Sequence, residues 1–135
     1  MNLGRRASFF LPLSLIGCSE GKTPQATAEA FIDRYYIERN HSRALELAAD
    51  GAAVRVREEK KLVEGNPAGA YAGVQPQVRY QLVKETPKGE DAELLYALSI
   101  DSSGVKLHKE LRLWVKKTGG VYKVVFFDER DVSAK

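Results

Sequence analysis

The sequence predicts an α+β fold in which N-terminal helices pack on one face of a curved, four-stranded antiparallel sheet. Apolar residues recur at three- and four-residue spacing in the first half of the chain and at two-residue spacing in the second half. Short, glycine-containing turns separate the predicted strands, which favours an antiparallel meander. Helices followed by strands indicate one two-layer domain, expected over residues 24–128.

The first helix is expected to begin at Thr23-Pro24, because threonine caps a helix and proline fits its first position. One apolar, largely aromatic stripe then runs along roughly four turns. The residues of this stripe are Ala28, Phe31, Ile32, Tyr35 and Tyr36.

Two further helices are predicted. Asn40-His41-Ser42 interrupts the helical pattern, and a short helix over residues 44–48 is expected to end at Asp50-Gly51. Residues 52–64 are expected to form the third helix, although Val54-Arg55-Val56 also alternates like a strand.

Residues 65–76 are rich in glycine and proline and are expected to connect the helical half to the strands. Turns are predicted at Pro87-Lys88-Gly89, Ser102-Ser103-Gly104 and Thr118-Gly119-Gly120, and the last is a strong hairpin signal. The fourth strand is expected over 121–127. The residues expected to face the helices from the first three strands are Val78, Tyr80, Leu82, Leu94, Tyr96, Leu98, Ile100, Leu107, Leu111, Leu113 and Val115.

The opposite face of the predicted sheet also carries apolar residues. They are Leu95, Ala97, Trp114, Tyr122, Val124 and Phe126. A sheet covered on one side is expected to be polar on the other, so an interface with a second copy or another protein is predicted at Trp114, Tyr122 and Phe126. Alternatively, one or two of these aromatic rings pack against the long side chains of Arg112 and Lys116.

The N-terminus has the features of a secretory signal. Arg5 and Arg6 precede an uncharged run over residues 7–18, which is far shorter than the roughly 20 residues of a membrane-spanning helix. The run ends on Leu15-Ile16-Gly17-Cys18, which resembles the lipobox of bacterial lipoproteins. The alternative is an ordinary buried segment in which Cys18 is a small core residue.

The lipobox resemblance implies a location as well as a modification. It implies cleavage between Gly17 and Cys18, a diacylglycerol thioether on Cys18, and residues 18–23 as a lipidated tether to the membrane. Ser19 after the cysteine implies, by the same resemblance, an outer membrane address facing the periplasm. Residues 129–135 are expected to form a polar tail.

Charge and cysteine content exclude several classes of function. Removing residues 1–17 takes away two of the 21 basic residues and none of the 18 acidic ones, which leaves a mature net charge of +1. A nearly neutral domain without a basic stripe gives no electrostatic basis for nucleic-acid binding. Cys18 is the single cysteine, so no disulfide framework is expected.

The aromatic first helix, a second helix carrying Arg43-Ala44-Leu45-Glu46-Leu47-Ala48-Ala49-Asp50-Gly51 and the long strands together resemble the nuclear transport factor 2-like superfamily, especially its small lipoproteins of unknown function. The likeness covers residues 24–128 in element order. It implies a cone whose sheet wraps the long helix and leaves a pocket open at one end. A cystatin-like helix-on-sheet roll without a pocket is the alternative. The superfamily contains enzymes, ligand binders and scaffolds, so function must be argued from the site.

The candidate pocket lining is aromatic: Phe31, Tyr35, Tyr36, Tyr80 and Tyr96. Enzymes of the superfamily pair a tyrosine with a carboxyl group whose pKa is raised by burial. No acid interrupts an apolar strand face, because Glu93, Asp101, Glu110 and Asp128 lie at strand ends or among polar neighbours. Asp33 falls towards the polar side of its helix. Catalytic residues are therefore not expected.

Metal and cofactor sites are not expected either. His41 and His108, the only histidines, lack ligand-like spacing, and His41 is expected in a solvated turn. The charged run over residues 55–61 has mixed signs and is expected to form a solvated helix face. The sequence thus favours a non-enzymatic envelope lipoprotein that binds a small apolar or amphipathic ligand or acts as a scaffold. The alternatives are an interaction module that uses the outer sheet face and, more distantly, an isomerase or dehydratase.

Overall fold

The computed structural model describes residues 22–65 and 75–132. The predicted signal peptide, the lipobox with Cys18, residues 18–21 of the tether and most of the 65–76 connection lie outside these residues. The helical elements are α3 (Pro24–Ile32), the π-helix η1 (Asp33–Ile37), α4 (His41–Leu45) and α5 (Asp50–Gly65). The strands are β1 (Gln77–Lys88), β2 (Asp91–Ser102), β3 (Val105–Thr118) and β4 (Val121–Asp131).

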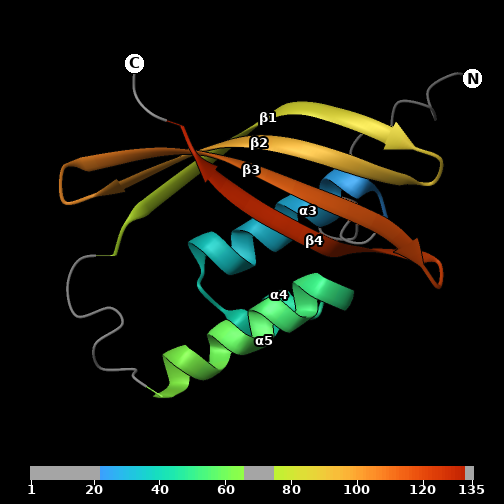
Figure 1. Cartoon of the computed structure of the whole chain (residues 1–135), viewed down its shortest axis with the longest axis horizontal. Coiled ribbons are helices and arrows are strands. Elements are labelled where there is room, and N and C mark those ends of the chain that lie inside the picture. The colour runs from blue at the N-terminus through green and yellow to red at the C-terminus, as the bar shows by residue number, and fades with distance from the viewer. Residues whose placement is uncertain (1–21, 66–74, 133–135) are drawn as a thin grey trace, which may run out of the picture.

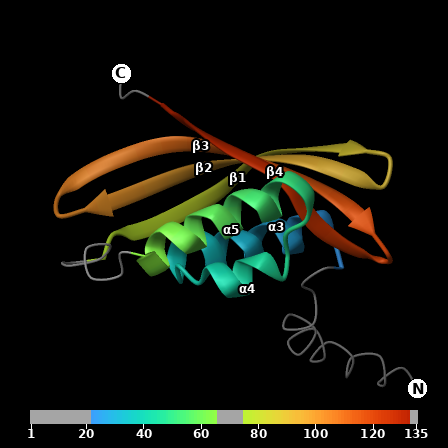
Figure 2. The same cartoon turned by 60° about the horizontal axis from the view of Figure 1, so that its bottom comes forward.

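The fold is α+β, as predicted. The four strands form one antiparallel sheet in the order β1-β2-β3-β4, which confirms the predicted meander. The sheet is strongly twisted, and the helices lie against one of its faces (Figures 1 and 2). Gly119 and Gly120 both have positive φ angles, 60° and 88°, as a tight hairpin turn between β3 and β4 requires.

The first helix changes from α- to π-helical winding halfway along. Thr23 caps α3 as predicted, since its hydroxyl accepts a hydrogen bond from the Ala26 amide at 3.0 Å. In η1 the hydrogen bonds span five residues, so the Glu38 amide donates to the Asp33 carbonyl at 2.8 Å. Arg39 ends the helix with a φ of 56°. Single π-helical turns occur frequently at functional sites, and this one carries Tyr35 and Tyr36.

The boundaries of the next two helices differ from the prediction. The predicted interruption is present at Asn40, which lies between η1 and α4 and caps α4, because its side-chain oxygen accepts a hydrogen bond from the Arg43 amide at 3.0 Å; His41 and Ser42 lie inside α4. α4 ends at Leu45, before the predicted 48. Asp50-Gly51 begins α5 instead of ending the preceding helix.

The connection between α4 and α5 binds the open edge of the sheet. The Val124 amide donates to the Leu47 carbonyl at 2.8 Å, and the Ala49 amide donates to the Val124 carbonyl at 2.9 Å. Ala48 and Val124 thereby form an isolated parallel bridge. This contact covers part of edge strand β4 and fixes the start of α5 against the sheet.

The core lies between the helices and the inner sheet face. Its largest fully buried side chains include Phe31 and Ile32 from α3 and Tyr96, Leu94 and Leu113 from the sheet. These side chains confirm the predicted inward set on the central strands. Leu107 shares their sheet face but is 47% exposed, because the β2–β3 hairpin extends beyond the helices (Figure 1).

A β-bulge in β4 overturns part of the predicted outer face. Trp114 pairs with Phe126 and Val115 pairs with Val124, so one extra residue lies between the two β4 positions. Val124 therefore faces the helices and is fully buried. Tyr122, two residues earlier, also packs partly buried against the core instead of facing outwards. A strict two-residue alternation cannot reveal such a bulge.

Trp114 and Phe126 do point outwards, 37% and 47% exposed. A second irregularity lies in β1, where the register shifts between Leu82 and Lys84. β4 continues to Asp131, so the residues after 128 that were expected in a polar tail include the last part of a strand.

Candidate functional site

A cleft opens at one end of the domain, between the helices and the sheet. Its volume is about 340 Å³. We call it the end cleft, and its lining residues are Tyr35, Tyr36, Arg39, His41, Glu59, Pro76, Val78, Ile100 and Glu129. The helices, β4 and, with Arg39, the link between η1 and α4 contribute the aromatic and charged side chains. Val78 and Ile100, which pair across β1 and β2, contribute an apolar wall with Pro76.

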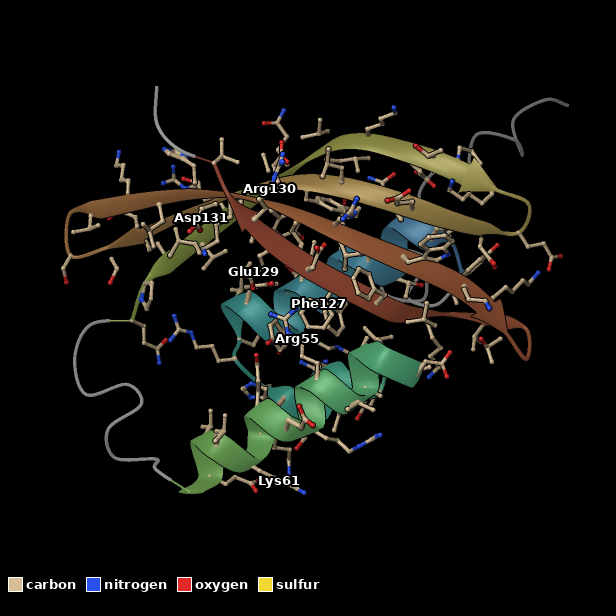
Figure 3. All side chains as sticks on the ribbon, viewed as in Figure 1. Arg55, Lys61, Phe127, Glu129, Arg130 and Asp131 are labelled. Atoms are coloured by element: carbon tan, nitrogen blue, oxygen red, sulfur yellow. The ribbon has the colours of Figure 1, made fainter. Side chains whose placement is uncertain are left out.

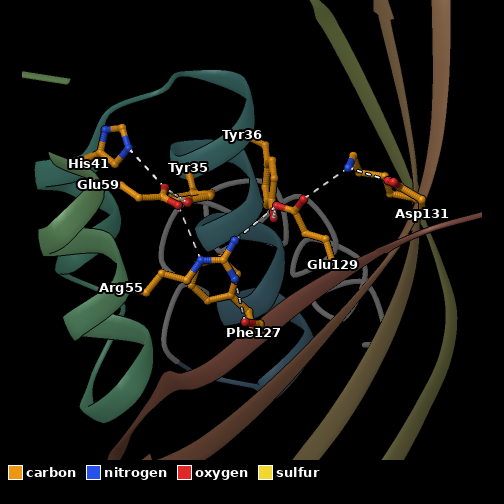
Figure 4. A network of polar contacts seen from close by, with 9 residues as sticks. Tyr35, Tyr36, His41, Arg55, Glu59, Phe127, Glu129 and Asp131 are labelled. Atoms are coloured by element: carbon orange, nitrogen blue, oxygen red, sulfur yellow. Dashed lines mark hydrogen bonds and ion pairs between the residues drawn. The ribbon is translucent and has the colours of Figure 1, made fainter. Parts of the chain in front are cut away.

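Both tyrosines of the π-helical turn donate hydrogen bonds to carboxylates. The Tyr35 hydroxyl donates to Glu59 on α5, and the Tyr36 hydroxyl donates to Glu129 on β4 (Figure 4). The Tyr35 and Tyr36 rings meet edge to face, with centroids 4.8 Å apart. Burial, reinforced by the Glu129 charge, raises the pKa of the Tyr36 hydroxyl, which therefore stays protonated and remains a donor.

Arg55 links the two carboxylates from one side. Its guanidinium nitrogens lie 3.6 Å from Glu59 and 3.6 Å from Glu129, and it donates to the Phe127 carbonyl at 2.9 Å. The guanidinium also stacks over the Phe127 ring, 4.1 Å from its centroid. Figure 3 shows Arg55 reaching from α5 towards β4, whereas Lys61 on the same helix points away from the sheet.

Lys109 extends this polar network along the sheet. Its ammonium group lies 2.7 Å from Asp131 and 3.7 Å from Glu129. The hydrogen bond from Lys109 to Asp131 raises the pKa of the lysine. The network of Glu59, Glu129, Asp131, Arg55 and Lys109 therefore holds three acidic and two basic groups (Figure 4).

His41 and Glu59 face each other in the end cleft with pKa values shifted towards one another. Nε2 of His41 lies 3.9 Å from Oε1 of Glu59, and the imidazole is only 11% exposed. Burial, with a smaller effect from Lys60, lowers the pKa of His41. Burial, with a smaller effect from Glu129, raises the pKa of Glu59. The predicted position of His41 in a solvated turn is therefore wrong.

Three of the five predicted lining residues lie away from the end cleft. Phe31 and Tyr96 are fully buried in the core. Tyr96 donates a hydrogen bond to Glu29 at 3.1 Å, and Tyr80 donates to Asp33 at 2.9 Å. Burial raises the pKa of both hydroxyl groups, and the neighbouring carboxylates add to the shift. Of the predicted set, Tyr35 and Tyr36 line the cleft.

The sequence reasoning missed the two carboxylates of the cleft. Glu59 was assigned to a solvated helix face, and Glu129 to the tail. A signal for Glu59 does exist, because it continues the three- and four-residue spacing of Ala52 and Val56, both buried. Glu129 likewise lies two residues after buried Phe127 on the same strand face. An acidic residue that continues an apolar stripe is thus the sequence feature that indicates Glu59 and Glu129 as residues of the cleft.

A second hollow, of about 330 Å³, lies on the outer sheet face and is called the outer groove. It is lined by Lys84, Thr86, Glu93, Leu95, Glu110, Arg112, Asp128 and Arg130. Arg112 pairs with Glu93 at 3.6 Å and with Asp128 at 3.5 Å. The outer face is thus more polar than its predicted apolar residues suggested. Trp114 pairs across the strands with Glu93, which lines the outer groove. The Lys88 ammonium lies 5.7 Å from the centroid of the Trp114 ring.

Within residues 22–65 and 75–132, no group of three or more histidine, cysteine or acidic side chains is arranged to hold a metal ion. The helices in this part of the chain are too short or too polar to span a membrane. No protein-family model, curated protein or solved structure matches the chain. The end cleft and the outer groove are therefore the features of this chain that bear on its function.

Proposed function

We propose that this chain is a lipid-anchored protein of the cell envelope whose single domain binds a small amphipathic molecule in the end cleft. The observation that carries the proposal is the division of the cleft into two kinds of wall. Pro76, Val78 and Ile100 form an apolar side, while tyrosine, histidine and carboxylate groups form a polar side. Concave sites that combine apolar and aromatic walls with converging polar groups are typical of small-molecule binding.

The polar side of the cleft is preorganised. Tyr35, Tyr36, Glu59 and Glu129 are each held by hydrogen bonds or ion pairs from a different element. Preorganised groups lose little side-chain freedom when a ligand binds, which favours affinity. The contacts among η1, α5 and β4 also keep the cleft open, since the polar side chains cannot collapse onto the apolar wall without losing them.

We propose binding without catalysis. Both tyrosine hydroxyl groups are engaged as donors to carboxylates, and Glu129 is held by Arg55 and Lys109. These contacts give the polar groups a structural role, since they hold the helices against the sheet and fix the positions of the side chains in the cleft. The raised pKa of Glu59 beside Tyr35 is the feature that favours the enzymatic alternative, an isomerase or dehydratase that transfers a proton.

Native mass spectrometry of the full chain tests the binding function. The wild type purified from cells is expected to retain a small organic molecule, which Ile100→Trp should lose because the indole fills the cleft. Val105→Trp, at a position 60% exposed on the same β2–β3 hairpin, is the matched control and should retain the molecule. Absence of any bound molecule in the wild type, or equal retention in Ile100→Trp, would contradict the proposal.

The fold and location form the second part of the proposal. A long first helix against a twisted four-stranded meander, with a cleft at one end, supports a cone of the nuclear transport factor 2-like type over the cystatin-like alternative. The lipobox motif supports anchoring through Cys18 in the outer membrane. Intact-mass analysis of the membrane fraction is expected to give a diacylglyceryl-modified chain beginning at Cys18, and Cys18→Ala should lose it. An unmodified, full-length wild-type chain would contradict this part.

A second candidate function is self-association through the outer sheet face. Trp114 and Phe126 are direct cross-strand partners on this face, and both are exposed. The outer groove beside them carries equal numbers of opposite charges, which suits a second copy of this chain in a two-fold arrangement. The charged residues are Lys84, Arg112, Arg130, Glu93, Glu110 and Asp128.

Cross-linking of the full chain in its membrane distinguishes this candidate. A cross-linked dimer is expected for the wild type, and the double substitution Trp114→Ser, Phe126→Ser should abolish it without unfolding the domain. A dimer that persists in the double variant, or a monomeric wild type, would count against self-association. A cross-link to a different protein would contradict self-association and identify that protein as the partner of the outer sheet face.

A further inference from the structure

The two ends of the domain bring together different parts of the chain. The start of α3 lies at the end that holds the β1–β2 and β3–β4 turns, whereas the β2–β3 turn and the end of α5 lie at the opposite end (Figures 1 and 2). We call the first the tether end and define it by residues 22–24, 88–91 and 116–123. The end cleft lies at the opposite end, since its apolar wall comes from the start of β1 and the end of β2.

Basic residues are concentrated at the tether end. It contains five of the 18 basic residues in the described ranges but two of the 17 acidic ones, which leaves 13 basic and 15 acidic residues elsewhere. The tether end is therefore positively charged, and the rest of the described chain is net negative. Its basic residues are Lys22, Lys88, Lys116, Lys117 and Lys123, and its acidic residues are Glu90 and Asp91.

Within residues 22–65 and 75–132, none of these five lysines forms an ion pair. Their contacts are with neutral groups: the Trp114 ring for Lys88, the Tyr122 ring for Lys117 and the Glu46 carbonyl for Lys123. The carboxylate of Asp91 accepts a hydrogen bond from the backbone amide of Lys117, at 3.1 Å. The positive charge of the tether end is therefore available to an external anion.

Two of the lysines face each other directly across the sheet. Lys116 and Lys123 are cross-strand partners next to the β3–β4 turn. Like charges directly opposite each other destabilise an antiparallel pair, and an anion placed against both would relieve the repulsion. Val121, 44% exposed, and half-buried Tyr122 lie on the same hairpin. Lysine beside apolar and tyrosine side chains is typical of surfaces at the lipid–water interface.

We propose that the tether end docks on the surface of a bilayer of anionic phospholipids, with its lysines against the lipid phosphates. The proposal goes beyond ligand binding and rests on the anchoring through Cys18 proposed above. A six-residue tether over residues 18–23 spans at most about 20 Å, so it keeps this end of the domain close to the membrane. A lipid anchor and a basic patch are complementary signals for membrane attachment. In the docked state, the end cleft faces away from the bilayer.

Hydrogen exchange with mass spectrometry tests the docking on the full, lipid-modified chain in nanodiscs of phosphatidylglycerol or of phosphatidylcholine. Both lipids hold the anchor, but their headgroups differ in charge. Amides of residues 116–123 are expected to exchange several-fold more slowly in phosphatidylglycerol. Amides of residues 102–105, at the β2–β3 turn, should exchange equally in both lipids. At about 1 M salt, where the Debye length is about 3 Å, the difference at residues 116–123 should disappear.

The double substitution Lys116→Gln, Lys117→Gln is expected to lower the ratio of docked to free domain about 25-fold, since each lysine at an anionic surface contributes about fivefold. The control Lys61→Gln, Lys106→Gln removes the same charge from exposed lysines outside the tether end and should behave like the wild type. Equal exchange of residues 116–123 in the two lipids would overturn the docking, and slow exchange in both would indicate a protein partner instead. Slow exchange that persists in the Lys116→Gln, Lys117→Gln variant would also overturn it. A chain absent from both kinds of nanodisc would contradict the anchoring itself and the docking with it.

Discussion

The hydroxyl of Tyr36 donates a hydrogen bond to the carboxylate of Glu129, although the two residues are 93 positions apart in the chain. The bond joins the π-helical turn near the start of the domain to the end of its last strand. Three further tyrosines repeat the arrangement, since Tyr35, Tyr80 and Tyr96 each donate to a carboxylate from another element. Tyrosine–carboxylate pairs thus connect the helical layer internally and to the sheet.

Removing the Tyr36 hydroxyl is expected to destabilise the domain. Tyr36→Phe leaves Glu129 partly buried without one of its donors, which should lower the free energy of unfolding by about 1–2 kcal/mol. Urea unfolding followed by far-UV circular dichroism measures the change. Tyr122→Phe is the control, because its ring packs on the core and its hydroxyl has no hydrogen-bond partner in the described part of the chain. Equal effects in the two variants would show that the Tyr36–Glu129 bond contributes nothing.

Two leucines on the same face of β3 should respond differently to truncation. Leu113→Ala leaves a cavity in the core, where the side chain is fully buried, and is expected to cost about 2–5 kcal/mol of unfolding free energy. Leu107→Ala removes the same atoms from a side chain that projects beyond the helices, and should cost less than about 1 kcal/mol. Thermal or urea unfolding distinguishes them. Similar losses would indicate that the β2–β3 hairpin end is covered.

His41 is expected to make the domain less stable in mild acid. Its pKa lies below the ordinary 6.5 in the folded chain, so the unfolded chain binds the proton more readily and stability falls as the pH drops below that value. The raised pKa of Glu59 acts in the opposite direction, since acidification favours its folded, protonated form. The wild type and the His41→Gln variant both contain Glu59. The difference between their pH dependences of stability therefore reports the contribution of His41.

The measurement is the urea midpoint at about pH 7.5 and about pH 5.5, on either side of the ordinary histidine pKa. The wild type is expected to lose more stability over this interval than His41→Gln. His108→Gln, which replaces an exposed histidine on β3, should follow the wild type. A His41→Gln variant with the wild-type pH dependence would remove His41 as the cause.

The β3–β4 turn should be sensitive to a side chain for conformational reasons alone. A Cβ at Gly120 would meet no atom within 4 Å, but the φ angle of 88° is unfavourable for alanine. Gly120→Ala is therefore expected to lower the unfolding free energy by about 1–2 kcal/mol. Gly65→Ala, at the end of α5 and also without a close neighbour, is the control and should be neutral or slightly stabilising. A neutral Gly120→Ala would show that the turn relaxes.

The sequence by itself determined the class of fold and most of the elements. The change from helical to two-residue spacing located three helices and four strands, and Thr23-Pro24 located the start of the first helix. It also identified Tyr35 and Tyr36, which line the end cleft, and the outward direction of Trp114 and Phe126. Helix and strand propensity and the periodicity of burial depend on residues close together in the chain, so they can be predicted from the sequence.

Only the tertiary structure decided which side chains meet. The bulge in β4 reverses the face of Tyr122 and Val124, because one extra residue shifts every position on one side of it. The pairing of Tyr35 with Glu59 and of Tyr36 with Glu129 depends on how α5 and β4 close against the π-helical turn. Such contacts join residues that are far apart in the chain, and no local pattern encodes their distance. The charge, shape and chemistry of the end cleft therefore arise from packing.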